Sequence, residues 1–551
     1  MDKIGVVDES SKGNYFKFIS DQRLPKGSFV EYNEPKLENI PILSKIIDMS
    51  TLKSFPPEFL SPDLDPEEAA EMAGIDLEDI GKFEIEAKII GYFREKTSEF
   101  VNPKIPPASG TPVKKASTSV LDYINKVEKE EENSAYIGKI IKTEKNVNLD
   151  ISEIINTHIS ILASTGSGKS YTVGVLIEEM LKEKNGASVL ILDPHGEYST
   201  LKDLENKSLL SNKEVINKFK YPNNELPDVK VFNEDDIQLK ISDLEFDDLA
   251  AIIDDGSMSE KMRHYLQRAY NKLKRKNFNQ EEIRDKVLEL KDKEGNYLKD
   301  HPLHSSSIEG ILWRLEKNIL NKDFFQNYTK LGLNELLSPK KASILDLSGI
   351  KAKDQQLLSS VILRKIFESR KMAVKGENKT NITKVPHPVF IVIEEGHRFA
   401  PNEGRSKSKN VLKTVLSEGR KFGIGVCLVS QRPSKLDTDS LSQCMSQITM
   451  KIINPYDQNK IKESIESVGK DIVDRLPSLS TGEAIISGST VNTPVNIEVR
   501  KRITRHGGKG VKNPSKSWKN NLKDNFYDKR DKTIQKDKET KLFSNENQKN
   551  K

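Results

Sequence analysis

Residues 159–181 read ISILASTGSGKSYTVGVLIEEML and form the stretch around which the predicted fold is built. A short apolar run, Ile159–Leu162, leads into a turn of small residues, and the chain leaves this turn as an amphipathic helix. Gly166 and Gly168 allow backbone N–H groups to face inward around a phosphate, because neither residue has a Cβ in the way. Lys169 would reach the β- and γ-phosphates, and the helix N-terminus would add the positive end of its dipole. The stretch therefore predicts a nucleoside-triphosphate site.

The predicted phosphate loop includes a metal-binding hydroxyl. Ser170 would offer its side chain to Mg²⁺. The usual loop, G-x-x-x-x-G-K-[ST], starts with Gly, whereas Ala163 stands at that position here. Ala is the smallest substitute, and the strand and helix that the motif requires flank the turn. We expect the nucleotide to contact Ser164, Thr165, Gly166, Ser167, Gly168, Lys169, Ser170 and Tyr171.

Length and charge restrict the possible partners. A chain of 551 residues should hold more than one domain. Of the net charge of +5, residues 509–551 contribute 13 Lys/Arg against 6 Asp/Glu, so the rest of the chain is slightly acidic. Contacts with nucleic acid must therefore come from local patches or from this tail. The two cysteines, Cys427 and Cys444, lack the spacing of a disulfide framework or a zinc site.

Neither a signal peptide nor a membrane span is expected. The N-terminus has no apolar core of the signal-peptide kind, and no run approaches about 18 apolar residues. We therefore expect a soluble, cytoplasmic protein.

The first 110 residues predict a small β-barrel. Short apolar stretches recur between turn signals, and an acidic, Pro-rich insertion over residues 55–79 interrupts them. These stretches are Ile4–Val7, Tyr15–Ile19, Ser28–Tyr32, Ile40–Ile46 and Phe83–Tyr92. Residues 111–136 continue a segment rich in Pro, Ser and Lys, and are expected to be a linker.

From residue 137 strands alternate with helices, which predicts an α/β domain with a parallel sheet. Residues 137–240 would form its first part and residues 336–508 its second. Between them, residues 241–335 have helical apolar spacing and predict a helical insertion. Strands are expected at 188–192, 342–347, 424–429, 449–453, 482–487 and 495–499, the last two as a hairpin. Residues 509–551 are predicted to be a disordered tail or an interaction arm.

A second apolar strand ends in two carboxylates. Residues 389–393 are apolar, and Glu394 and Glu395 follow directly. One acid can hold the Mg²⁺ shell while the other orients and deprotonates the attacking water. From their order we assign Glu394 to the metal and Glu395 to the water. Another strand, 188–192, ends in Asp193 and Glu197, where a ligand site and a capped turn are equally good interpretations.

Further polar residues lie near the second part of the sheet. Gln431, at the end of a strand, could sense the γ-phosphate, and Arg420, before that strand, could act on a neighbouring subunit as an arginine finger. A surface salt bridge is the alternative for Arg420. Arg405, Lys407 and Lys409 are candidate DNA contacts, although an ordinary solvated loop explains them as well.

Separated motifs together resemble the HerA-type DNA translocases of the HerA/FtsK branch of P-loop ATPases. They are ILASTGSGKS (161–170), ILDPHGEYS (191–199), FIVIEEGHRFAP (390–401), LSEGRKFGIGVCLVSQRPSKLD (416–437) and GEAIISG (482–488). The resemblance implies a RecA-like core after a HAS-barrel-like domain, and a hexameric ring with ATP and Mg²⁺ at each subunit interface. It also implies double-stranded DNA in the channel, and a partner nuclease of the NurA kind or an antiphage effector. The motifs carry the catalytic roles onto Lys169, Glu394, Glu395, Gln431 and Arg420.

One departure from this family concerns residues 157–158. Thr157-His158 stands where many relatives have Arg-His. If that arginine assists hydrolysis in the relatives, this chain must either do without it or use another cation, such as Lys421. Two other functions stay open from the sequence. One is a conjugation or secretion motor, and the other is a scaffold for a nuclease whose assembly ATP controls.

Overall fold

The computed structural model describes residues 3–507 and Ser515, apart from short segments. The excluded positions within that range are 9–12, 53–63, 77–80, 95–98, 128–130, 207–215, 255–256, 274–276, 322–324, 327–331, 378–382, 405, 407 and 465–468. The candidate DNA contacts Arg405 and Lys407 therefore lie outside the described residues, as does the tail 509–551 except for Ser515.

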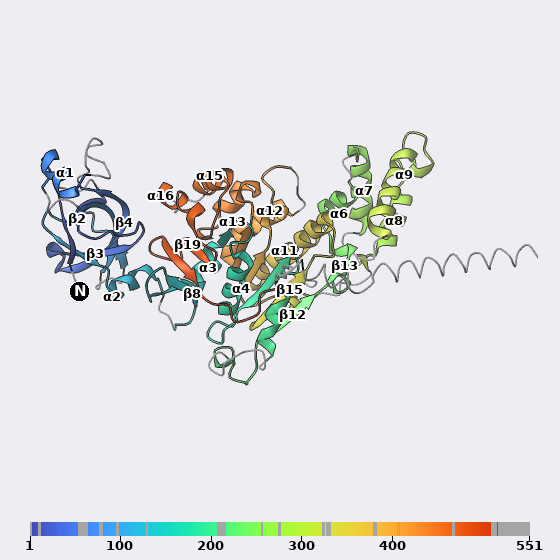
Figure 1. Cartoon of the computed structure of the whole chain (residues 1–551). Coiled ribbons are helices and arrows are strands. Elements are labelled where there is room, and N and C mark those ends of the chain that lie inside the picture. The colour runs from blue at the N-terminus through green and yellow to red at the C-terminus, as the bar shows by residue number, and fades with distance from the viewer. Residues whose placement is uncertain are drawn as a thin grey trace, which may run out of the picture. The chain divides into compact units, whose positions relative to one another are not determined.

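The N-terminal strands close into a barrel, which confirms the predicted small β-barrel (Figure 1). Its order is β2-β1-β7-β3-β4-β5, and pairing of β2 with β5 closes it, while β6 adds to β5. Phe16, Phe18 and Tyr32 fill the interior and are fully buried. The strands are β1 (Lys3–Val7), β2 (Tyr15–Ser20), β3 (Phe29–Glu34), β4 (Ile40–Thr51), β5 (Phe83–Arg94), β6 (Glu99–Val101) and β7 (Pro112–Lys115).

Strand β7 lies within residues 111–136, where the sequence predicts a linker. It pairs antiparallel with both β1 and β3, and Val113 is completely buried in the barrel core. Four residues after a Pro-rich stretch are too few to show alternation of apolar and polar residues. The same region also contains α2 (Thr118–Leu121) and the start of β8 (Ser134–Ile140).

The remaining strands build one 11-stranded sheet in the order β12-β15-β11-β16-β17-β10-β18-β19-β20-β8-β9. From β12 to β18 neighbouring strands are parallel, and β18 onward is antiparallel, including the predicted hairpin β19–β20. Besides β8, the strands are β9 (Asn146–Asp150), β10 (Ile159–Leu162), β11 (Ser188–Asp193), β12 (Asp228–Phe232), β15 (Lys341–Asp346), β16 (Val389–Ile393), β17 (Ile424–Ser430), β18 (Ser446–Thr449), β19 (Glu483–Gly488) and β20 (Val495–Val499).

Strand β18 is displaced from the predicted 449–453 because its register with β10 fixes its end. Ser446 lies opposite Ile159 and Thr449 opposite Leu162, so the pairing stops where β10 stops. The next residues turn toward the phosphate loop, and the Lys451 carbonyl accepts a hydrogen bond from the Ser164 N–H at 2.9 Å.

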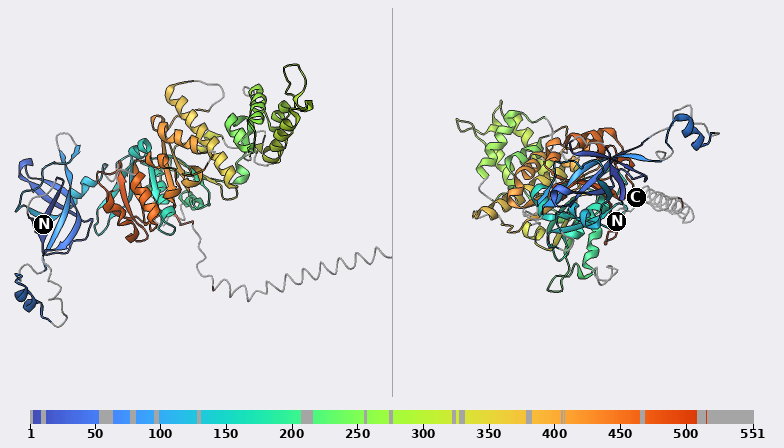
Figure 2. Two further views of the ribbon diagram at one scale, coloured as in Figure 1. Left: turned by 90° about the horizontal axis from the view of Figure 1, so that it is seen from above. Right: turned by 90° about the vertical axis from the view of Figure 1, so that its left-hand side faces the viewer.

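Helices cover both faces of the sheet, which explains why its strands are apolar almost throughout. In β16, Val389, Ile391 and Ile393 face one core, while Phe390 and Val392 face the other. Helix α4 (Lys169–Met180) packs into the second core, and α11 (Ala352–Lys375) and α13 (Lys409–Glu418) into the first (Figure 2). This is the α/β architecture that the sequence predicts.

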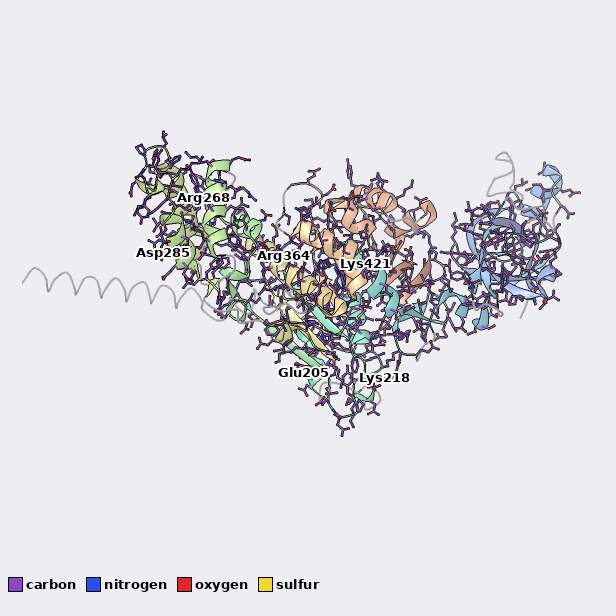
Figure 3. All side chains as sticks on the ribbon, turned by 180° about the vertical axis from the view of Figure 1, so that it is seen from behind. Glu205, Lys218, Arg268, Asp285, Arg364 and Lys421 are labelled. Atoms are coloured by element: carbon purple, nitrogen blue, oxygen red, sulfur yellow. The ribbon has the colours of Figure 1, made fainter. Side chains whose placement is uncertain are left out.

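The insertion is mainly helical and shares its core with one face of the sheet. A two-stranded sheet, β13 (Leu239–Lys240) with β14 (Phe325–Gln326), lies at its base. Asp248 of the insertion accepts a 2.7 Å hydrogen bond from Arg364 of α11, which ties the two parts together. Figure 3 labels Arg364. Its helices are α6 (Phe246–Ile253), α7 (Glu260–Leu273), α8 (Gln280–Leu288), α9 (Ser305–Leu315) and α10 (Leu333–Leu336).

Shorter helices complete the described structure: α1 (Pro66–Ala73), α3 (Ile151–Thr157), α12 (Gly396–Phe399), α14 (Thr438–Ser442), α15 (Pro455–Ser464) and α16 (Lys470–Val473). None of the helices in the described ranges combines the length and the apolar character that crossing a bilayer requires.

Replacing Val113 by Asp should unfold the barrel, because a carboxylate would be buried there without a partner. We expect the free energy of unfolding to fall by about 3 kcal/mol or more. Lys115→Asp, on the exposed end of the same strand, is the matched control and should leave stability within about 0.5 kcal/mol. Thermal melting of the full-length variants, and limited proteolysis followed by mapping of cleavage within residues 1–115, measure the effect of both substitutions. Equal tolerance of the two changes would mean that β7 is not part of the barrel.

Candidate nucleotide site

The phosphate loop connects β10 to α4, and hydrogen bonds fix its conformation. Gly166 and Gly168 have φ of 80° and 103°, the left-handed region that favours glycine. A Cβ on Gly168 would also approach Met450 Cε to 3.3 Å. The Ser167 hydroxyl donates to the carbonyl of Ser164 at 2.7 Å and to that of Lys451 at 3.1 Å. The loop is thus preformed by its own chain and by the segment after β18.

Lys169 lies between the two predicted acids. Its Nζ is 2.6 Å from Glu394 Oε1 and 2.9 Å from Glu395 Oε1, and all three side chains are buried. Consecutive side chains on a strand point to opposite faces, so both can meet one ammonium only where the chain leaves the extended conformation. Glu395 has a left-handed backbone with φ 51° and ψ 48°, which provides this break. Such a conformation is uncommon outside glycine and strains the chain locally.

Burial and charge divide the two carboxyl groups. Complete burial raises the pKa of Glu394 to about 7, and the Lys169 charge only partly offsets this. Burial would also raise the pKa of Glu395, but the neighbouring Lys169 and His397 hold it below its usual value. Burial lowers the pKa of Lys169, but the charges of Glu394 and Glu395 raise it by more, so the net shift is upward. The resting site therefore holds a charged lysine between Glu395, which stays ionised, and Glu394, which takes up a proton more readily.

The carboxylates after β11 have different tasks. Asp193 accepts hydrogen bonds from the backbone N–H groups of His195, Gly196 and Tyr198 at 3.2, 2.9 and 3.0 Å, and so caps the turn. Burial raises the pKa of Asp193 to about 6. Glu197, by contrast, accepts a hydrogen bond from the Ser170 hydroxyl. The capped turn is thus the correct interpretation for Asp193, and Glu197 is a residue of the site that sequence reasoning did not assign.

Gln431 reaches the phosphate loop because β17 lies between β10 and β16. Its Oε1 accepts a 2.6 Å hydrogen bond from the Thr165 hydroxyl. His397, which the sequence did not single out, lies on α12 with Nδ1 3.3 Å from Glu395 Oε2 and 3.2 Å from the Ser430 hydroxyl. Burial lowers the pKa of His397. The structure thus brings Lys169, Ser170, Glu394, Glu395 and Gln431 together.

The residues present fit a magnesium nucleotide. A triphosphate needs hydrogen-bond donors and positive charge. Here the backbone N–H groups of the loop at the helix N-terminus and the buried lysine can supply them, together with the Ser170 hydroxyl. Glu394 Oε2 is buried and accepts no hydrogen bond from the described residues. Ser170 and Glu394 would hold Mg²⁺, which would supply charge neutralisation for the phosphates. In the described part of the chain, no group of three or more His, Cys, Asp or Glu residues is arranged as a metal cage of its own.

Arg420 and the candidate DNA contacts lie elsewhere. Arg420 and Lys421 are exposed on the short helix η10 (Gly419–Phe422), which precedes β17, whereas the phosphate loop and Gln431 follow the carboxyl ends of their strands. Figure 3 labels Lys421 on this connection. Seven residues of strand span about 23 Å, so Arg420 does not reach the site of its own chain. Lys409 is engaged with Asp437 Oδ1 and the Pro401 carbonyl, each at 2.8 Å.

His158 lies in the core and belongs to neither the nucleotide site nor the candidate DNA contacts. Its Nε2–H donates to the Leu416 carbonyl at 2.8 Å, and its Nδ1 accepts from the Val426 N–H at 3.1 Å. Burial, with a smaller contribution from the charge of Arg420, lowers the pKa of His158 to about 4. The ring is therefore neutral near pH 7, with its proton on Nε2.

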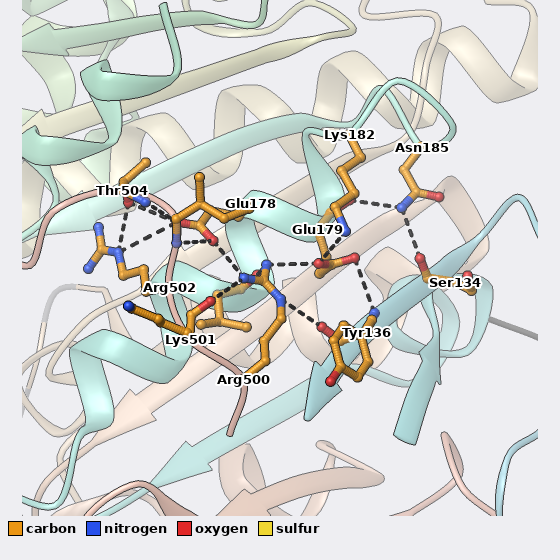
Figure 4. Close-up of polar contacts among 12 residues, drawn as sticks. Ser134, Tyr136, Glu178, Glu179, Lys182, Asn185, Arg500, Lys501, Arg502 and Thr504 are labelled. Atoms are coloured by element: carbon orange, nitrogen blue, oxygen red, sulfur yellow. Dashed lines mark hydrogen bonds and ion pairs between the residues drawn. The ribbon is translucent and has the colours of Figure 1, made fainter. Parts of the chain in front are cut away.

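A C-terminal strap, residues 500–505, binds the helix that follows the phosphate loop (Figure 4). Glu178 accepts hydrogen bonds from the Thr504 N–H and hydroxyl at 2.8 and 2.9 Å and pairs with Arg500 at 3.0 Å. Arg500 also pairs with Glu179 at 2.8 Å. Both glutamates are fully buried, and a Cβ on Gly174 would come within 2.5 Å of the Arg502 guanidinium carbon. Helix α4 is thus fixed by charged groups from the far end of the domain.

Glu178→Ala should loosen the strap, because it leaves the N–H groups of Ile503 and Thr504 without their acceptor and removes one of the two carboxylates that pair with Arg500. Breaking a buried pair from one side costs about 3–5 kcal/mol. Glu183→Ala, exposed just beyond the same helix, should be nearly neutral. Thermal unfolding and hydrogen exchange of residues 500–505 give the comparison. If both variants retain the protection of the parent protein, the strap does not stabilise α4.

Acidification should destabilise the protein through His158. The unfolded chain takes up a proton below its ordinary pKa of 6.5, while the folded protein does not until about pH 4. Its stabilising contribution is complete above pH 6.5 and is lost as the pH falls toward 4, by about 3 kcal/mol in total. Melting temperatures of the parent and of His158→Phe across this range should show a smaller loss in the variant. Parallel curves would contradict the assignment.

Comparisons with known proteins give a family for this chain. A family model described as "Helicase HerA, central domain" matches residues 135–366. A probable helicase of Methanocaldococcus jannaschii is 30% identical over 437 residues, which cover 77% of each chain. The DNA double-strand break repair helicase HerA of Sulfolobus acidocaldarius is 31% identical over 442 residues, 76% of this chain and 79% of that protein. VirB4 of Thermoanaerobacter pseudethanolicus aligns with a TM-score of 0.48 at 11% identity, over 68% of this chain and 98% of that structure.

The sequence likeness extends well beyond the phosphate loop, over about three quarters of this chain and of its relatives. Together with the buried lysine and acid pair on a parallel α/β sheet, it establishes an ATP hydrolase of the P-loop class. The chain belongs to the HerA helicase family.

Proposed function

We propose that this protein is an ATP-driven translocase on double-stranded DNA, and that it works as a hexameric ring in which each ATP pocket is completed by the adjoining subunit. The observation that carries the proposal is the position of Arg420. This exposed cation precedes β17, about 23 Å of strand away from the loop and Gln431 at the other edge. In a head-to-tail ring, opposite edges of neighbouring subunits meet. Arg420 is thereby suited to a neighbour's pocket and unsuited to its own.

The residues of the pocket divide the work of hydrolysis. Lys169 exchanges its two carboxylate partners for phosphate oxygens when nucleotide binds, and Ser170 and Glu394 hold the Mg²⁺ that neutralises phosphate charge. Glu395 is then released from the lysine but stays beside His397, where it can orient a water and accept its proton. Gln431, which contacts Thr165 of the phosphate loop, is suited to sense the γ-phosphate. Arg420 from the next subunit adds the charge that stabilises the transition state.

DNA contacts are assigned to loop cations that do not read sequence. Arg405 and Lys407 carry this role in the proposal, while Lys409, held by Asp437, contributes through the position of its helix. The relative of Sulfolobus acidocaldarius is named a DNA double-strand break repair helicase, which favours DNA-end processing. A nuclease that uses the ends delivered by the motor, or an antiphage effector, is the expected partner class.

Co-expression of two inactive variants tests the shared pocket. Lys169→Ala loses its own pocket but keeps Arg420, whereas Arg420→Ala loses the finger but keeps the pocket. Each alone should lose about 10³-fold or more of its ATP turnover. Co-expressed at equal levels, they form about a quarter of their interfaces from an intact pocket and an intact finger, and turnover should reappear.

The same ATPase assays are run with and without linear duplex DNA. Turnover of the parent should rise with DNA, and this stimulation should fall steeply as salt is added, because phosphate contacts release counterions. Full activity of Arg420→Ala, or failure of the mixed rings to recover, would refute the trans finger. Turnover that ignores DNA at all salt concentrations would instead favour an ATP-controlled scaffold.

A further inference from the structure

The segment that carries Arg420 is fixed at both ends by one buried side chain. We call this segment, residues 419–423, the finger connector; it joins α13 to β17. His158 belongs to neither element, since it lies between α3 and β10, more than 250 residues earlier in the chain. Its ring is 1% exposed and uses both nitrogens.

The two hydrogen bonds of His158 enclose the connector. Nε2–H donates to the Leu416 carbonyl at 2.8 Å, before the connector, and Nδ1 accepts from the Val426 N–H at 3.1 Å, after it. The ring therefore sets the separation between the end of α13 and the start of β17. Only a group with a donor and an acceptor in fixed, opposite directions can do this, and a neutral imidazole is such a group.

Other contacts fix the backbone of the connector and leave the Arg420 side chain outside. Arg370 of α11 donates from Nε to the Phe422 carbonyl at 2.8 Å, and Gly423 turns the chain with φ 68°. At Gly425, a Cβ would come within 2.6 Å of the Ile155 side chain, so α3 packs directly against β17. Arg420 itself is exposed. A rigid base with an exposed guanidinium is the arrangement that a residue acting on another molecule requires.

We propose that His158 is a positioning residue for Arg420, and that it acts on the ATP pocket of the adjoining subunit by holding the finger connector. This inference rests on the proposed trans role of Arg420. His158 touches neither nucleotide nor DNA in this assignment. Its effect is geometric, because a displacement of about 1 Å at a reacting group can lower the rate about 100-fold.

An alternative route would give His158 an effect on its own pocket. Strand β10, Ile159–Leu162, begins directly after His158 and ends at the phosphate loop. A change at position 158 could then disturb the loop along the strand. The two routes predict defects on opposite sides of a subunit interface, so they can be separated.

Three substitutions remove the contacts in steps. His158→Phe keeps the ring volume but loses both hydrogen bonds. His158→Asn keeps an acceptor near the Nδ1 position for Val426, and His158→Gln keeps a donor near the Nε2 position for Leu416. For His158→Phe we expect kcat to fall about 100-fold with KM for ATP changed less than about twofold. Asn and Gln should lie between it and the parent, and in an Arg420→Ala background none of the three should lower kcat further.

Mixed rings then decide on which side of the interface His158 acts. Co-expressed with Lys169→Ala, which supplies an intact finger, His158→Phe should recover turnover. Co-expressed with Arg420→Ala, which supplies only an intact pocket, it should not. The opposite pattern would overturn the proposal and assign His158 to its own phosphate loop. Parent-like kcat in all three His158 variants would overturn it as well.

Loss of stability is controlled separately. Leu266→Ala removes a fully buried side chain from the helical insertion and should lower the melting temperature without changing the interface pattern. If His158→Phe does not fold, the Asn and Gln variants are used in the same mixing experiment with the same two outcomes. Should Arg420→Ala itself stay active, the trans finger fails. An inactive Arg420→Ala beside parent-like His158 variants refutes only the present inference.

Discussion

A buried ammonium between two carboxylates governs the central part of this molecule. Lys169 has no solvent to compensate its charge, and Glu394 and Glu395 take over that task at 2.6 and 2.9 Å. Burying one of these charges alone would be very costly, so the strand that carries the acids and the loop that carries the lysine must come together. In the proposed mechanism a nucleotide would bind by exchange, with phosphate oxygens replacing the carboxylates around the same cation. The resting pocket is thus paired internally and still prepared for its ligand.

The rest of the sheet places accessory groups around this pair. Because β17 separates β10 from β16, Gln431 comes between the loop and the acids and accepts from Thr165. Glu197 meets the Ser170 hydroxyl from the neighbouring β11 turn, which Asp193 caps. On the other side of α4, Glu178 and Glu179 bind the strap at residues 500–505. The phosphate loop is therefore supported from the carboxyl edge of the sheet and from the C-terminal end of the domain.

The opposite edge of the sheet carries a different set of groups. There a neutral His158 joins the ends of α13 and β17, and Arg420 stands exposed on the connector between them. One short strand, β10, has this edge at its start and the phosphate loop at its end. In the proposed ring, each subunit would present a pocket at one edge and a positioned cation at the other, as catalysis shared between subunits requires.

The sequence by itself determined the parallel α/β core and the barrel, because apolar runs and glycine spacing are local signals. It also singled out Lys169 and the acid pair, which the structure brings together. It could not determine that β7 closes the barrel or that β18 ends at Thr449, since strand pairing with distant segments decides both. Nor could it choose between a cap and a ligand site for Asp193 and Glu197, or find His397 and the two partners of His158. Those depend on contacts across tens to hundreds of residues, and only the tertiary structure brings such groups within hydrogen-bonding distance.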